Sequence, residues 1–180
     1  MSMEEAEIPT EHLQEEMHHH AESSSQSWIM GVALTSALLA VLAAVSALQS
    51  GHDANEAMIE QMKASDSWSY YQAKGIKAAV LGSKIDFRRA LKQPVAPKDE
   101  EKIGAYEDEQ AKISGEAKEL EASSRRHLET HEVFATAVTL FQVAIGIAAI
   151  SALTRKRRFW LVSMAFGAVG LVFFVQGFLK

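Results

Sequence analysis

Three uncharged, mainly apolar runs divide the chain, and polar residues fill the segments between them. The runs cover residues 28–48, 133–153 and 159–179, and each contains 21 residues without an Asp, Glu, Lys, Arg or His. An α-helix rises about 1.5 Å per residue, so each run would be about 30 Å long, which matches the hydrocarbon thickness of a bilayer. Buried helices of soluble proteins seldom hold more than about 14 consecutive apolar residues. The pattern therefore predicts three transmembrane helices.

Residues 49–132 separate the first two runs and carry a helical pattern of their own. Two prolines at residues 93–97 interrupt this pattern and predict a turn between two helical arms. On the second arm, the inward positions recur at alternating spacings of three and four, which is typical of a coiled coil. They are Ile103, Tyr106, Gln110, Ile113, Ala117, Leu120, Ser124, His127, His131 and Phe134. We expect an all-α membrane protein with a long extramembrane antiparallel coiled-coil hairpin.

The first arm of this hairpin has two apolar faces. One face contains Met58, Met62, Ile76, Val80 and Phe87, and the other contains Trp68, Tyr71, Gly75, Ala78, Gly82 and Ile85. A lone two-helix hairpin buries little apolar area, so one face is expected to pack on the second arm and the other on a second subunit. We therefore expect a homo-oligomer. The residues predicted to serve packing or oligomerisation are Trp68, Tyr71, Ile113, Leu120 and Gln142, the last being a polar residue midway along the second run.

Charge indicates the orientation in the membrane. Lys and Arg in short loops stay on the cytoplasmic side, and the short connection of residues 154–158 contains Arg155, Lys156, Arg157 and Arg158. With this cytoplasmic anchor, the N-terminal tail of residues 1–27 is cytoplasmic and the hairpin is periplasmic or extracellular. The tail has seven Glu and no Lys or Arg, which argues against a cleavable signal peptide. No extended basic surface indicates nucleic acid as a partner.

Three polar segments carry a likeness to a known family. They are residues 9–16 (PTEHLQEE), 55–61 (NEAMIEQ) and 64–74 (ASDSWSYYQAK). Together they resemble the bacterial domain-of-unknown-function family 4337, and the resemblance extends over nearly the whole chain. It implies a small multi-pass protein of the bacterial inner membrane with a helical extramembrane part. It brings no activity and no catalytic residues.

Histidines are the main candidates for chemistry. His52 follows the first run, while His127 and His131 precede the second and share one helix face. They are candidates for a divalent metal site, for a pH switch, or for polar residues that set the register of the seam. In the tail, His18 and His19 form a second candidate metal site with neighbouring Glu residues. We expect no resident cofactor, although a divalent metal remains open.

Signatures of catalysis are missing from the sequence. It has no cysteine, no phosphate-binding glycine loop, no nucleophile elbow and no His-Glu-x-x-His helix, so we expect no enzyme. The uncharged runs disfavour ion-coupled transport. Our main hypothesis is an oligomeric scaffold or interaction protein whose partners are itself, membrane lipids and an unspecified protein.

Two other functions remain open. One is a passive oligomeric channel or regulator of ion flux, whose pore residues would be Thr35, Ser36, Thr139 and Gln142. The other is a metal or pH sensor that acts through the boundary histidines.

Overall fold

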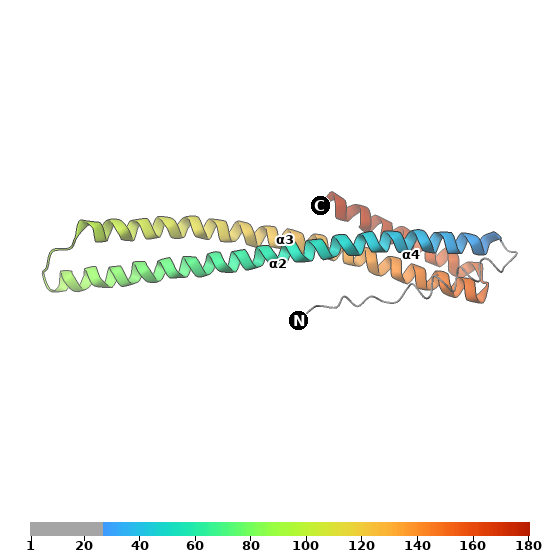
Figure 1. The fold of residues 1–180 in the computed structure, drawn as a ribbon, viewed down its shortest axis with the longest axis horizontal. Coiled ribbons are helices and arrows are strands. Elements are labelled where there is room, and N and C mark those ends of the chain that lie inside the picture. Colours follow the sequence, from blue (N-terminus) through green and yellow to red (C-terminus); the bar gives the residue numbers. More distant parts are fainter. Residues whose placement is uncertain (1–26) are drawn as a thin grey trace. The chain divides into compact units, whose positions relative to one another are not determined.

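Three α-helices make up the part of the chain that the computed structural model describes, residues 27–180 (Figure 1). They are α2 (Ser27–Ala90), α3 (Pro97–Thr154) and α4 (Arg157–Leu179), and these residues contain no strand. The predicted all-α class is thus confirmed for this part. Each helix includes a stretch long and apolar enough to cross a membrane. Nearly all of the predicted tail, including His18 and His19, lies outside the described residues.

Contacts divide the chain into two compact units. Among the described residues, the three-helix unit is residues 27–53 with Glu129–Lys180, and the two-helix unit is Ala54–Leu128. Helices α2 and α3 each pass through both units without a break. The continuity follows from the sequence, because neither helix contains a proline beyond its first residue.

The three-helix unit buries many small residues and exposes many large apolar ones. Its buried positions include five serines and three glycines: Ser36, Ser46, Ser50, Ser151, Ser163, Gly167, Gly170 and Gly177. The large apolar residues that it exposes on α2 are Met30, Leu34, Leu38, Val41, Val45 and Leu48. Soluble proteins place large apolar residues inside and rarely leave so continuous an apolar surface open. The distribution suits an apolar solvent, in which close backbone approach holds helices together.

Each of these five buried serines donates its hydroxyl hydrogen to a backbone carbonyl. The Ser163 hydroxyl on α4 donates to the Ala144 carbonyl on α3 at 2.6 Å, which joins two helices. Ser151 donates to Lys156 O at 3.1 Å, beside the connection to α4. Unpaired polar groups are costly in an apolar interior, so these bonds let the small side chains be buried without that cost.

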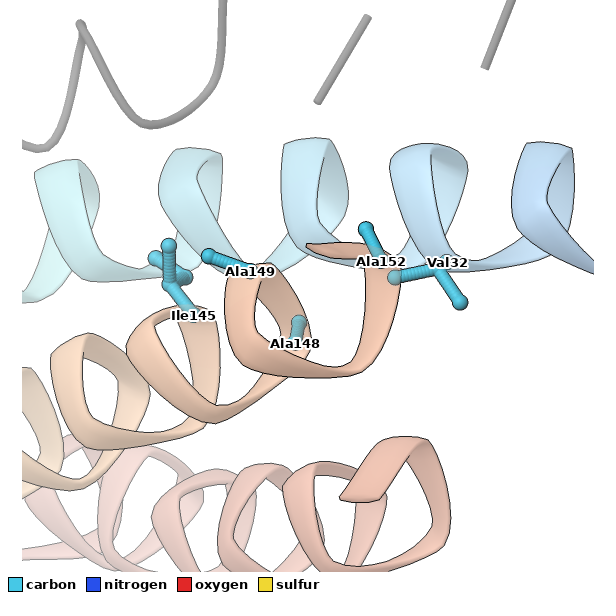
Figure 2. Packing of buried hydrophobic residues seen from close by; sticks show 5 residues of the cluster. All are labelled: Val32, Ile145, Ala148, Ala149 and Ala152. Atoms are coloured by element: carbon cyan, nitrogen blue, oxygen red, sulfur yellow. The ribbon is translucent and has the colours of Figure 1, made fainter. Parts of the chain in front are cut away.

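Alanines on α3 provide the surface on which α2 packs. Figure 2 shows Val32 of α2 next to Ala152 of α3, at one end of a cluster that continues along α3 through Ala149 and Ala148 to Ile145 and whose members are at most 8% exposed. Small residues at a spacing of four on α3, Ala144, Ala148 and Ala152, are all buried. On α2, small residues are not buried as consistently, because Ser36 is buried but Ala44 is exposed.

Glycines allow α4 to approach α3. A Cβ atom added at Gly170 would lie 2.9 Å from the Phe141 ring, and one at Gly177 would lie 2.6 Å from the Phe134 ring. Both rings are at most 1% exposed, so neither has free space to move into. The two helices therefore contact through glycine backbone and aromatic rings, and Phe134 also packs edge-on against Phe178 at 5.1 Å.

Helix α2 ends in a Schellman motif before the turn to α3. The Gln93 amide donates to Arg88 O at 2.9 Å and the Lys92 amide donates to Arg89 O at 3.0 Å. Lys92 has a φ of 55°, the left-handed conformation that glycine usually supplies at this position. Pro97 then begins α3, where its missing amide hydrogen costs no helical bond.

The packing of α4 predicts that Gly170→Ala destabilises the protein. We expect a loss of about 1–3 kcal/mol because the added methyl group meets the buried Phe141 ring. The control is Gly146→Ala on α3, where no atom lies within 4 Å of the new Cβ and the stability should be unchanged or raised. Thermal unfolding followed by circular dichroism in one detergent compares the two. Equal midpoints would contradict the close approach of α3 and α4.

The Schellman motif predicts the opposite sign for Lys92→Gly. Removal of the Cβ relieves the left-handed backbone, and we expect a gain of up to about 1 kcal/mol. Ala111→Gly, at an exposed helical position of α3, should lose about 1 kcal/mol. Chemical unfolding of both variants measures the difference. A loss of stability in Lys92→Gly would show that this residue is not left-handed.

Candidate functional site

The inward face of α3 in the two-helix unit follows the predicted seam. Ile113, Ala117 and Ser124 are buried, and the other seam positions between residues 103 and 127 are half-buried, Leu120 among them. Leu128, between two predicted seam positions, is exposed. The spacing of three and four therefore selected the side of α3 that faces α2.

Hydrogen bonds between the two helices show that they run antiparallel. Ser124 Oγ donates to Ala57 O at 2.7 Å, and Gln110 Nε2 donates to Tyr71 O at 3.1 Å. Residue numbers thus rise along α2 as they fall along α3, as the predicted hairpin requires. Gly75 makes room for Gln110, because a Cβ at this position would lie 2.8 Å from Gln110 Nε2.

The aromatic residues singled out on α2 lie at this contact. Trp68 is half-buried and its Nε1 donates to Glu121 Oε1 on α3 at 2.8 Å. The Tyr71 ring meets the Trp68 ring edge-on at a centroid distance of 5.5 Å. Tyr70 is exposed. Trp68 and Tyr71 therefore serve packing within the chain, and the Glu121 partner could not be read from local spacing.

A lysine between two tyrosine rings pairs with a carboxylate in the middle of the two-helix unit. Lys74 Nζ forms a salt bridge with Glu109 and lies 5.1 Å from the Tyr70 ring and 5.3 Å from the Tyr106 ring. Hydrogen bonding to Glu109, followed by that to Tyr70, raises the pKa of Lys74. The pair therefore stabilises the unit below the ordinary lysine pKa, and this contribution is lost as the pH rises through the raised value.

Ion pairs tie the helices together near the turn. Lys84 Nζ lies 2.7 Å from Asp99 Oδ2, and Arg89 Nη2 lies 2.7 Å from Glu100 Oε1. The hydrogen bond from Lys84 lowers the pKa of Asp99. This carboxylate therefore stabilises the unit above its ordinary pKa, and the contribution is lost as the pH falls through the lowered value. Exposed ion pairs of this kind each contribute little to the free energy of unfolding. Their role here is to hold the two helices in one register at the turn.

One apolar face of α2 stays open in the two-helix unit. Met58, Met62, Ile76, Val80 and Phe87, the face expected to meet a second subunit, are between 53% and 67% exposed. The neighbouring face packs on α3, and its Ile85 is 3% exposed. Four further exposed, uncharged residues continue the open face, and sequence reasoning missed them because they are polar: Ser65, Ser69, Gln72 and Ser83.

The boundary histidines do not form a metal-binding cluster. Within residues 27–180, no group of three or more His, Asp or Glu is placed to hold an ion. His52 is exposed on α2, and His127 is half-buried on α3. The Nδ1 atom of His131 lies 2.9 Å from the carbonyl oxygen of Ser50, and the Ser50 hydroxyl lies 3.3 Å from His131 O. His131 thus bonds α3 to α2.

The polar residues expected to line a pore lie on different surfaces of the three-helix unit. Ser36 is 2% exposed and donates to Ala33 O, while Thr35 accepts a hydrogen bond from Trp160 Nε1 at 3.1 Å. Thr139 is exposed and donates to Ala135 O at 2.9 Å. They are therefore not gathered on one face of a single chain.

Gln142 has unused hydrogen-bonding capacity. Its half-buried side chain forms no hydrogen bond with any residue from 27 to 180. The sequence predicts that this amide bonds a neighbouring helix, and no described helix supplies the partner.

The basic connection between α3 and α4 is shorter than expected. Arg155 and Lys156 alone separate the two helices, because α3 continues to Thr154 and α4 begins at Arg157. All four basic residues of the predicted anchor, including Arg158, are exposed. The Arg157 guanidinium lies 5.6 Å from the Trp160 ring. This end of the unit therefore combines basic and aromatic residues, a combination typical of a cytoplasmic membrane boundary.

An open recess of about 330 Å³ lies in the two-helix unit beside Gln61, Glu121, Ser124, Arg125 and Leu128. Two of its polar groups already have partners, because Ser124 donates to Ala57 O and Glu121 accepts from Trp68. The recess thus presents no activated nucleophile beside a base.

Comparison with known proteins identifies the family. A family model described as "Domain of unknown function (DUF4337)" matches residues 28–180, which contain nearly all of α2 and the whole of α3 and α4. No curated protein and no solved structure matches the chain. The resemblance inferred from the polar segments is confirmed, and the chain belongs to the DUF4337 family.

Proposed function

We propose that this protein is an oligomeric scaffold or interaction protein of the bacterial inner membrane. The open face of α2 carries the proposal, because five large apolar side chains more than half exposed lie on a unit that is otherwise rich in charge. Exposed apolar patches of this kind mark contact surfaces. In this proposal, three spans anchor the chain and the two-helix unit is a coiled-coil hairpin outside the bilayer that holds copies of the protein, or a partner, together.

The three-helix unit supports the membrane part of the proposal. Large apolar side chains cover much of its exterior, while its interior combines many serines, alanines and glycines with a few larger side chains such as Phe134 and Phe141. The four basic residues at positions 155–158 lie on the connection between two candidate spans and in the first turn of α4, which favours a cytoplasmic position for this end. Insertion would then place Ala54–Leu128 on the opposite side of the membrane.

The scaffold is favoured over a channel or a sensor by the same contacts. A pore lining would require Thr35 and Ser36 on an open surface, but Ser36 is buried and Thr35 bonds Trp160. A metal sensor would require additional ligands around His131, whose Nδ1 bonds Ser50. The open face of α2 requires a protein partner and no ligand.

Cross-linking in native membranes tests the oligomer. We expect a short lysine-reactive reagent to yield discrete multimers, because Lys63 and Lys77 are exposed on the same helix as the open face. The protein purified in mild detergent should give the same species by light scattering. Vesicles reconstituted with it should show no conductance above that of protein-free vesicles. A monomer in both experiments would sink the scaffold, and a reproducible unitary conductance would favour the channel.

The orientation can be tested because the chain contains no cysteine. Gln93→Cys, in the exposed turn of the two-helix unit, should react with an impermeant maleimide in intact spheroplasts. Lys156→Cys, in the basic connection, is the control and should react only after lysis. The reverse pattern would place the basic connection outside.

A further inference from the structure

We propose that the open face of α2 packs against the same face of a second copy, with the two helices parallel and in register. The inference rests on the proposed membrane scaffold and names the partner of its contact surface. The contact surface on each copy is a row of nine residues on α2: Met58, Met62, Ser65, Ser69, Gln72, Ile76, Val80, Ser83 and Phe87. We call it the α2 row.

The α2 row has the geometry of a helix–helix contact. Its members follow one another at spacings of three or four residues, and the average spacing is close to the 3.6 residues of a helical turn. The row therefore runs along one side of a straight helix. All nine members are exposed, and the opposite side of α2 is occupied by α3.

The α2 row is free of charge, although about a third of residues 54–128 are charged. A charged partner would find no counter-ion on this surface, whereas an identical copy meets no like charge. Its apolar members would meet their own counterparts, as at Ile76 and Phe87. Its serines and Gln72 each carry both a donor and an acceptor, so two copies can bond each other across a symmetry axis.

Membrane anchoring explains the parallel register. Copies inserted with one orientation are related by axes along the membrane normal, so each residue of α2 lies at the same height in every copy. Two rows that face each other then align without any sliding. An antiparallel pair of rows would require one copy to be inverted in the membrane.

The size of the α2 row fits a contact that depends on the membrane. Twenty-nine residue steps of about 1.5 Å give a length of about 44 Å. With a width of about 10 Å, two copies would bury roughly 900 Å², which is below the range of stable interfaces between freely diffusing proteins. Confinement in one membrane raises the effective concentration of copies and offsets this deficit.

Disulfide trapping in membranes tests the register, because each introduced cysteine is the sole thiol of its chain. We expect Met62→Cys, Ile76→Cys and Ser83→Cys each to form disulfide-linked dimers on mild oxidation, since facing positions bring identical residues within disulfide reach. The matched control is Lys63→Cys, an exposed position of α2 outside the row, which should stay monomeric. Equal trapping at Lys63→Cys would overturn the proposed face.

Charge substitution tests the same contact without relying on thiol chemistry at the interface. Ile76→Lys or Ile76→Glu places like charges opposite each other, and each should abolish trapping of Met62→Cys. Because Ile76 is 65% exposed, the two-helix unit should keep its helical signal and thermal midpoint. Co-expression of the Lys and Glu versions, each with Met62→Cys, should restore the dimer. Trapping that survives Ile76→Lys would contradict the contact.

Different outcomes would contradict the parallel contact of the α2 row and the oligomeric scaffold. If lysine cross-linking still gives multimers but no cysteine of the α2 row is trapped with itself, the scaffold stands and the parallel row is wrong. If Met62→Cys forms disulfides only when mixed with Ser83→Cys, the copies are antiparallel. If no multimer forms by either method, both the row and the scaffold fail.

Discussion

The distance of closest approach between helices governs the three-helix unit. Glycine at residues 170 and 177 lets α4 contact the buried rings of Phe141 and Phe134, and a methyl group at either position would overlap a ring. On the other side of α3, alanines meet Val32 of α2. In the bilayer that we propose for this unit, burial of large side chains would give little driving force, and close packing and hydrogen bonds such as that from Ser163 would hold the helices together.

The two-helix unit uses different interactions along the same two helices. Its surface is charged, and its interior mixes apolar residues with polar groups that find partners on the other helix. Trp68 bonds Glu121 and Ser124 bonds the Ala57 carbonyl, so these polar contacts fix the register as well as the antiparallel direction. Two helices cannot cover all of each other, and α2 keeps an open apolar face. That remaining face is the physical reason to expect another helix beside it.

The spacing of residues along the chain predicted which helix faces form candidate surfaces, but not which residues those faces contact. The seam of α3 was visible as a repeat of three and four, and the two faces of α2 were visible in the same way. Spacing could not say which face of α2 would pack on α3, because both are apolar. It also grouped His52, His127 and His131 by their distance from the runs. In the structure, His131 bonds Ser50 of α2, whereas His52 is exposed because it lies two residues beyond Ser50 and about 200° around that helix.

By itself, the sequence determined the number of helices, their apolar stretches, the turn at the prolines and the family. Each of these depends on neighbours along the chain: uncharged runs, helical periodicity and proline geometry. Tertiary structure decided which side chains are covered. Helix α3 contacts Trp68 of α2 but does not cover Ile76. Helix α4 approaches α3 so closely that only glycine fits at residue 170, next to the Phe141 ring. These outcomes depend on residues far apart in sequence, whose meeting is set by packing.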